Sequence, residues 1–168
     1  MNYTAFFEGK EPDDLGRNLL KILHFGRIRM ELTHNYIQRL FPLAEESRFS
    51  ECDLLTEEDR LAFRGSILAQ DGMRGAYQKM LWFWKLDGEQ YKNSVYRHWN
   101  AYNNHNHWRM SRVLKSLQLL GMEEEYKDFS MRIRWIIDHP QQYRVTGVTV
   151  KIWIAELTGK AWRQEKRI

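Results

Sequence analysis

The sequence predicts an all-α fold, a single compact bundle of about seven to eight helices. Apolar residues recur every three to four positions almost throughout the chain, which is the period of a helix buried on one face. Only three prolines occur among the 168 residues, at positions 12, 42 and 140, where helices can begin or end. With 43% hydrophobic and 14% aromatic residues the chain can fill one core, so we expect residues 1–168 to form a single domain.

The first two predicted helices lie before Pro42. Pro12, which is followed by two aspartates, suits the first turn of a helix that we expect to end near Gly26. A second helix is predicted over residues 27–41 and should stop at the proline that follows it. Residues 43–55 are polar and irregular, and they are expected to form a loop.

The next two predicted helices carry the most apolar part of the chain. Thr56 and Asp59 are spaced as in a capping box, which predicts the start of a third helix. Gly72 is expected to separate this helix from a fourth over residues 73–85. Residues 80–84, with the sequence MLWFW, are apolar all round, so the fourth helix should be central and buried on most sides.

Three or four helices are predicted in the second half of the chain. Two lie over residues 91–102 and 105–120, separated by a pair of asparagines, and Gly121 is expected to stop the second. Another begins at three consecutive glutamates and extends over residues 123–139, just before a proline. Residues 150–157 are rich in β-branched side chains, and the sequence leaves open whether they form a helix or a short β segment.

A stretch without acidic residues, residues 90–122, carries the main functional signal. It contains five Lys or Arg, three of the six His and five Asn. Outside it 21 basic residues stand against 22 acidic ones, so the net charge of +4 comes from this stretch. We interpret it as a surface that binds an anion or an acidic partner.

The predicted helix over residues 105–120 has two different faces. Its leucines fall on one side, and His105, Arg109, Arg112 and Ser116 cluster on the opposite side. Two guanidinium groups one turn apart repel each other, so a negative group is expected near them. A carboxylate from elsewhere in the fold and a bound ligand both satisfy this expectation.

Three short sequences follow patterns that are specific enough to compare with a family. Residues 34–42 read HNYIQRLFP, residues 105–121 read HNHWRMSRVLKSLQLLG, and residues 55–58 between them read LTEE. They resemble the H-x-Y-I-Q-W-L-F-P, H-N-x-x-R-x-x-R-x-L-K-S-L-x-x-L-G and L-T-x-E motifs of the conserved domain of the opioid growth factor receptor family. The resemblance covers about residues 15–130, and Arg39 stands where the family has Trp.

The resemblance implies a set of candidate site residues, but the peptide-receptor activity of the animal members is not carried over to this chain. Animal members bind an opioid pentapeptide, whereas this chain resembles the bare conserved domain, a stand-alone form that also occurs in bacteria. The polar positions of the two long motifs are carried over as candidate ligand-binding residues: His34, Tyr36, Gln38, His105, Asn106, Arg109, Arg112 and Lys115.

The favoured interpretation is a non-enzymatic binding or regulatory module with a basic groove for an anionic ligand, a peptide or an acidic protein segment. Three alternatives remain open: a nucleic-acid-binding protein, an enzyme of unrecognised type using His34 or His105, and a purely structural or assembly role. No catalytic residue, cofactor or metal site is predicted. His105 and His107 point to different faces of a helix, which does not suit a shared metal ion.

The sequence also bears on where the protein is found. Its first residues lack a basic segment followed by an apolar one, so no signal peptide is expected. The longest apolar runs are too short for a transmembrane segment. A single cysteine, Cys52, fits a reducing compartment. We therefore expect a soluble cytoplasmic protein, while the oligomeric state stays open.

Overall fold

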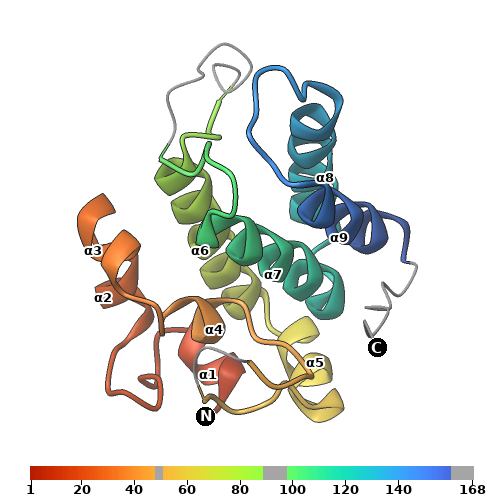
Figure 1. The fold of residues 1–168 in the computed structure, drawn as a ribbon. Coiled ribbons are helices and arrows are strands. Elements are labelled where there is room, and N and C mark those ends of the chain that lie inside the picture. The colour runs from red at the N-terminus through yellow and green to blue at the C-terminus, as the bar shows by residue number, and fades with distance from the viewer. Residues whose placement is uncertain (48–50, 89–97, 160–168) are drawn as a thin grey trace, which may run out of the picture.

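The computed structural model describes residues 1–47, 51–88 and 98–159, and within these ranges the chain is all-α without a strand (Figure 1). This confirms the predicted fold class. The helices are α1 (Tyr3–Phe7), α2 (Leu19–Leu23), α3 (Arg27–Leu32), α4 (Ile37–Leu40), α5 (Glu57–Arg64), α6 (Ile67–Trp84), α7 (His105–Leu120), α8 (Glu123–Asp138) and α9 (Gly147–Thr158). None of these helices combines the length and the apolar composition that crossing a bilayer requires.

The N-terminal part forms two short helices, α1 and α2, and the helix predicted from Pro12 to Gly26 is wrong in its first half. The carboxylate of Asp13 accepts hydrogen bonds from the backbone N–H groups of Leu15 and Arg17, at 3.0 and 2.8 Å. This side chain therefore stabilises a turn where a helix was expected. The helix begins only after Asn18, whose side chain caps α2.

The single helix predicted over residues 27–41 is divided into α3 and α4. Thr33 is extended, with φ −94° and ψ 121°, and it ends α3. Arg17 donates to the side-chain oxygen of Asn35 at 2.8 Å, and Arg39 donates to the backbone oxygen of Asn35 at the same distance. Long side chains thus satisfy the backbone oxygen of Asn35, which an unbroken helix would have used in its own hydrogen bonds. The predicted stop at Pro42 holds, because α4 ends at Leu40.

Helices α5 and α6 meet at a different point from the one predicted. The capping box between Thr56 and Asp59 is present and opens α5. The break follows at Gly65, and Ser66 caps α6. Gly72, which was expected to separate two helices, lies inside α6 instead. A Cβ atom there would overlap the carbonyl oxygen of Phe7, so the glycine lets α1 pack directly on α6.

The predictions for α7 and α8 are confirmed. Asn104 caps the first of these helices, and Gly121 ends it with φ 76°, a left-handed conformation that favours glycine. The helix predicted over residues 91–102 falls largely outside the described residues, and 98–102 form turns. For the segment that the sequence left open, the structure shows α9, a helix capped by Thr146.

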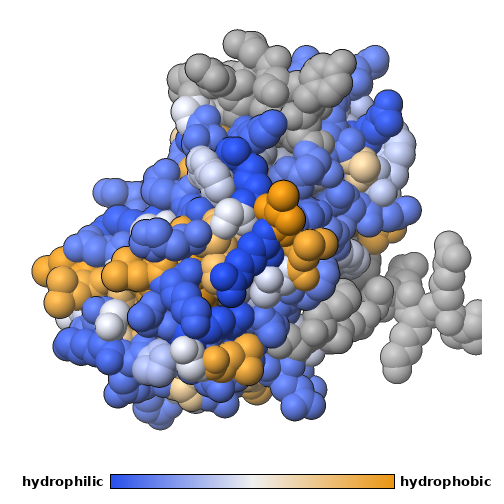
Figure 2. Space-filling model, turned by 90° about the vertical axis from the view of Figure 1, so that its left-hand side faces the viewer, coloured by the Kyte–Doolittle hydropathy of each residue, from blue (hydrophilic) through white to orange (hydrophobic). Residues whose placement is uncertain are grey.

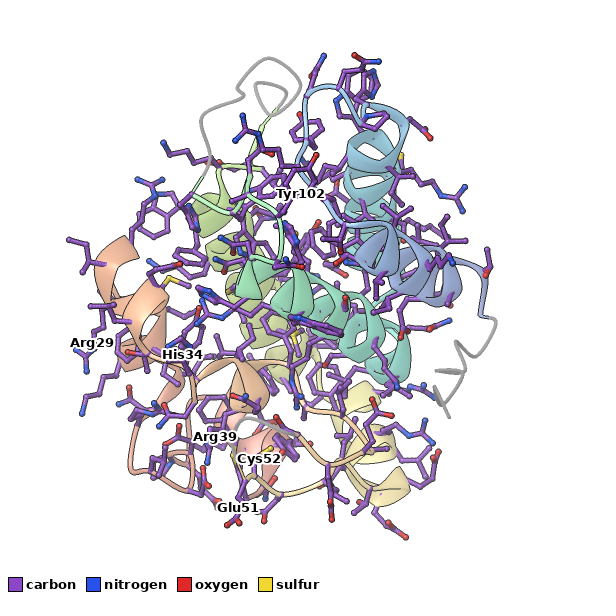
Figure 3. All side chains as sticks on the ribbon, viewed as in Figure 1. Arg29, His34, Arg39, Glu51, Cys52 and Tyr102 are labelled. Atoms are coloured by element: carbon purple, nitrogen blue, oxygen red, sulfur yellow. The ribbon has the colours of Figure 1, made fainter. Side chains whose placement is uncertain are left out.

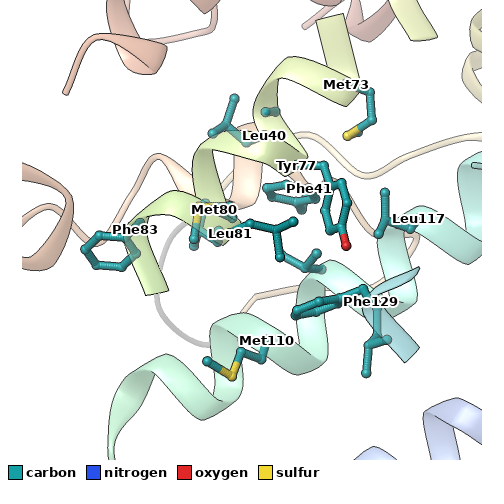
Figure 4. Packing of buried hydrophobic residues seen from close by; sticks show 14 of the residues in the cluster. Leu40, Phe41, Met73, Tyr77, Met80, Leu81, Phe83, Met110, Leu117 and Phe129 are labelled. Carbon is teal, nitrogen blue, oxygen red and sulfur yellow. The ribbon is translucent and has the colours of Figure 1, made fainter. Parts of the chain in front are cut away.

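The core is organised around α6, as the run of apolar residues at its C-terminal end predicts. Met80, Leu81, Phe83 and Trp84 are all at most 2% exposed. Figure 4 shows side chains of α6 packed against those of α7 and α8. α1, α2 and α5 also pack on α6, and α7 contacts α5, α8 and α9. The core therefore holds α7 firmly, with its polar face directed toward α3 and α4.

Candidate functional site

A groove of about 760 Å³ lies between α4 with the loop that follows it and the polar face of α7. α9 contributes Ile152 and Glu156 to one side of it. Both long sequence motifs therefore meet at one place, although about seventy residues separate them in the sequence. Figure 3 shows His34 in the segment that joins α3 to α4, on the side nearest α7.

Six of the eight predicted site residues line this groove, and two lie behind it. The lining residues are His34, Gln38, His105, Arg109, Arg112 and Lys115. Tyr36 and Asn106 have no exposed surface. The indole N–H of Trp84 donates to Asn106 at 3.1 Å, which ties α6 to the start of α7. Burial raises the pKa of Tyr36, so its hydroxyl stays protonated in the core.

Arg109 uses its hydrogen bonds within the protein. It is 5% exposed, and it donates to the backbone oxygens of Met30 at 3.1 Å and Thr33 at 3.0 Å. It also donates to the side-chain oxygen of Asn106 at 3.2 Å and lies 3.4 Å from Nδ1 of His34. The break between α3 and α4 leaves these backbone oxygens without helical partners. Arg109 therefore fixes the shape of the groove by joining α7 to the end of α3.

Arg112 and Gln38 carry polar atoms that have no partner in the protein. Arg112 donates from Nε to the backbone oxygen of Phe41 at 2.7 Å, but its Nη2 atom is buried without a hydrogen bond. Burial lowers the pKa of Arg112. Gln38 is 3% exposed, and its amide nitrogen donates to Ser47 at 3.4 Å while its Oε1 atom is buried without a partner. Buried polar groups are usually satisfied. Other buried polar atoms of the described residues also lack a partner, but among the residues concerned it is Gln38 and Arg112 that line the groove.

The groove also contains carboxylates, whose identity and positions the sequence did not predict. Lys115 pairs with Glu45 at 2.7 Å, and Glu46 and Glu156 lie nearby in the lining. Burial raises the pKa of Glu156. These glutamates come from the loop after α4 and from α9, which local sequence patterns could not place beside α7. Helical spacing could have identified Trp108 as a further groove residue, because it lies one turn from Arg112 on α7. Trp108 is 49% exposed and forms part of the groove wall.

One end of the groove holds a group of histidines around Glu31. His105 lies 3.2 Å from the Glu31 carboxylate, and His98 lies 3.6 Å from it. The rings of His34 and His105 pack edge to face, with centroids 5.5 Å apart. Burial lowers the pKa of both His98 and His105, and the charge of Arg109 contributes for His105. Within the described ranges no three His, Cys, Asp or Glu side chains are arranged so that they could hold a metal ion.

His107 points away from this group, as the helical spacing predicts. It is 1% exposed, its Nε2 atom lies 3.0 Å from the backbone oxygen of Trp99, and its Nδ1 atom is buried without a partner. Burial lowers the pKa of His107, so the folded protein favours the neutral ring. The hydrogen bond identifies Nε2 as the atom that carries the proton.

Because His107 is buried, we expect the folded protein to lose stability in acid. The unfolded chain binds a proton near the ordinary histidine pKa of about 6.5, whereas folded His107 resists protonation. The free energy of unfolding should therefore fall as the pH drops from about 7.5 through about 6.5 toward the lower pKa of the folded state. Urea denaturation of the wild type and of His107→Gln across this range measures it, and the variant should lose less. Equal losses would show that His107 is not responsible.

Arg39, which replaces the family Trp, lies outside the groove. It is 2% exposed, and two of its nitrogens donate to the carboxylate of Asp14 at 2.6 and 2.7 Å. This ion pair holds α4 to the chain before α2. The pair keeps the pKa of Asp14 below its usual range and that of Arg39 above it. Arg39 therefore serves the fold and is not part of the groove lining.

The comparisons with known proteins agree with the two sequence motifs. Residues 10–140 match the opioid growth factor receptor conserved region. The opioid growth factor receptor of Mus musculus is 32% identical over 104 residues, and that of Homo sapiens is 34% identical over 103 residues. These alignments cover 56% of this chain but only 16% and 15% of the relatives. No solved structure matches the chain. The chain therefore belongs to the opioid growth factor receptor family through its conserved region.

Proposed function

We propose that this chain is a non-enzymatic binding module, and that the groove between α4 and α7 takes a peptide segment with an acidic group. The observation that carries the proposal is the pair of unpaired buried atoms, Nη2 of Arg112 and Oε1 of Gln38. An unsatisfied buried polar group costs about 1–3 kcal/mol, which a ligand that pairs with it recovers on binding. A carboxylate or carbonyl suits the arginine, and an amide N–H suits the glutamine.

The walls of the groove favour a peptide over a polyanion. Ile37, Leu43, Trp108 and Ile152 supply apolar surface, as is usual for small-ligand sites. The carboxylates of Glu45 and Glu156 lie in the same lining as Arg112 and offset part of the positive charge. A nucleic-acid backbone would meet these carboxylates with unfavourable energy. The mouse and human relatives are named receptors for an opioid growth factor, and a peptide groove is in keeping with that name.

A thermal-shift screen tests the proposal. The probes are tripeptides with free or amidated carboxyl ends, nucleotides and inorganic phosphate. A ligand at about one hundred times its Kd stabilises the folded chain by about 2.7 kcal/mol. For a chain of this size, such a gain raises Tm by roughly 5–10 °C. We expect tripeptides with a free carboxylate to give the largest rise.

The variant Arg112→Met removes the unpaired donor and should abolish the rise in Tm. Lys127→Met is the matched control, because this lysine on α8 lies outside the groove and its side chain is 75% exposed. It should leave the ligand response unchanged. A rise that persists in Arg112→Met, or one produced only by nucleotides and phosphate, would refute a peptide groove built around this arginine.

The second candidate is an enzyme that uses His105 or His34 as an acid–base residue. It rests on one observation: His105 contacts the Glu31 carboxylate, and His34 contacts Arg109, at the end of the groove. Such a combination of histidine, carboxylate and arginine occurs in catalytic sites. Incubation of the tripeptide pool with the protein, followed by mass spectrometry, separates the candidates. Binding without any change of mass supports the module, and turnover that His105→Gln abolishes supports the enzyme.

A further inference from the structure

A second surface, far from the groove lining, combines exposed apolar residues with cations. Leu20 on α2 is 62% exposed, and Ile28 and Leu32 on α3 are 78% and 72% exposed. Ile28 and Leu32 are four residues apart, so they project from the same side of α3. These three residues together with Arg27 and Arg29 form what we call the α2–α3 ridge. Figure 2, viewed from this side, shows apolar surface interrupted by strongly hydrophilic surface.

Helix α3 is held to the fold mainly by polar contacts of Arg27, Met30 and Glu31, so core packing does not explain the apolar residues on its exposed side. Met30 is the buried residue of this six-residue helix. α2 and α3 lie at the outer edge of the molecule (Figure 1). Apolar side chains scattered singly over a surface are normal, whereas several on one short ridge indicate an interaction site.

The two arginines of the ridge and the neighbouring Lys79 lie against aromatic rings. The guanidinium carbon of Arg27 lies 4.1 Å from the centre of a Trp82 ring, and Arg27 also donates to the Trp82 backbone oxygen at 3.1 Å. The ammonium group of Lys79 lies 3.8 Å from the centre of a Trp82 ring. The guanidinium carbon of Arg29 lies 3.9 Å from the Phe25 ring centre. The aromatic rings therefore fix these charges, whereas solvated cations would move freely.

Among the described residues these cations have no negative partner. Across the part of the chain that the structure describes, no carboxylate forms an ion pair with Arg27, Arg29 or Lys79. Burial and the nearby charge of Arg27 both lower the pKa of Lys79. The like charges around Trp82 thus repel each other, and a carboxylate from outside would relieve the repulsion.

We propose that the α2–α3 ridge binds an acidic amphipathic helix of a partner protein. The apolar side of that helix covers Leu20, Ile28 and Leu32, and its carboxylates pair with Arg27 and Arg29. Charge complementarity selects an acidic partner, and the fixed guanidinium groups suit the directed bidentate pairing that carboxylates offer. Exposed leucine and isoleucine side chains disfavour a nucleic-acid backbone, which would leave them uncovered.

A peptide-display selection on the intact chain tests this inference. A library of random sixteen-residue peptides is selected for binding to the wild type. The binding of the enriched peptides to the double variant Ile28→Ser/Leu32→Ser is then measured. Ile67→Ser/Leu68→Ser is the matched control, because these residues at the start of α6 are 74% and 61% exposed. We expect the enriched peptides to carry acidic and apolar residues three to four positions apart. Their affinity should fall at least tenfold in the ridge variant and stay unchanged in the control. Arg112→Met should not affect them, which separates this surface from the groove.

Four outcomes would overturn the proposal. The first is a set of enriched peptides that are basic or polar, and the second is an enrichment that the ridge variant does not reduce. The third is sedimentation with phosphatidylserine vesicles that depends on Ile28 and Leu32, because it would assign the ridge to a membrane surface. The fourth is self-association in gel filtration that the double variant abolishes, because it would assign the ridge to contact between two copies.

Discussion

Replacing Arg109 by methionine is expected to lower the free energy of unfolding by about 3 kcal/mol. The variant leaves the backbone oxygens of Met30 and Thr33 without the donor that now satisfies them, and the side-chain oxygen of Asn106 keeps only its hydrogen bond from Trp84. For a chain of this size the change corresponds to a fall in Tm of roughly 6–12 °C. Thermal and urea denaturation followed by circular dichroism measure it.

Arg112→Met is the matched control for this result, because the two arginines lie one turn apart on α7. Arg112 loses one hydrogen bond to Phe41, but the same change removes a buried nitrogen that has no partner. We expect a cost of about 1 kcal/mol or less. Similar destabilisation by both variants would contradict the distinction between Arg109 as the residue that shapes the groove and Arg112 as the residue that binds ligand.

Gly72→Ala is expected to destabilise the fold by about 3 kcal/mol, although alanine is the better helix former. The added Cβ atom would overlap the carbonyl oxygen of Phe7 and lie 3.0 Å from Cδ2 of Leu19. A backbone oxygen cannot rotate away as the flexible side chain of Leu19 can, so α1 must shift on α6. Urea denaturation with a determined m-value measures the loss of stability.

Gly75→Ala, three residues further along α6, tests the same explanation, because here the free energy of unfolding is expected to rise. Its Cβ atom would lie 3.5 Å from Cδ1 of Leu23, an ordinary van der Waals contact. Alanine should then stabilise the helix by about 0.5–1 kcal/mol. If both alanine variants stabilise the protein, α1 does not approach α6 as closely as the structure shows.

The helices with clear local signals were predictable from the sequence. The bounds of α7 follow from Asn104 as the cap and Gly121 as the stop, and the capping box at Thr56 marks the start of α5. The two-faced character of α7 was also visible, because helical spacing alone assigns its leucines to the core. The same spacing places His105, Arg109 and Arg112 together on the opposite face, which is the face that lines the groove.

Other features depend on contacts that no local pattern contains. The break between α3 and α4 is stabilised by Arg109, which lies 76 residues after Thr33 in the sequence. Gly72 resembles a helix break in the sequence, because glycine is a poor helix former. In the structure it lies inside α6 and allows the close approach of Phe7. Glu45 and Glu156 reach the groove only through the tertiary fold, so the predicted basic stretch acquires carboxylates as neighbours. Tertiary contacts override local preference in each case.

The indole N–H of Trp108 reports most directly on the binding of a peptide in the groove. This ring lies in the groove wall, whereas Trp82 lies beside the α2–α3 ridge and serves as an internal reference. A pool of tripeptides with free carboxyl ends is titrated into ¹⁵N-labelled protein, with the indole signals assigned by Trp→Phe variants. We predict that the Trp108 signal moves in the wild type and stays in place in Arg112→Met. The Trp82 signal should not respond in either protein. A Trp108 signal that stays in place in the folded wild type, or moves equally in Arg112→Met, would contradict the account.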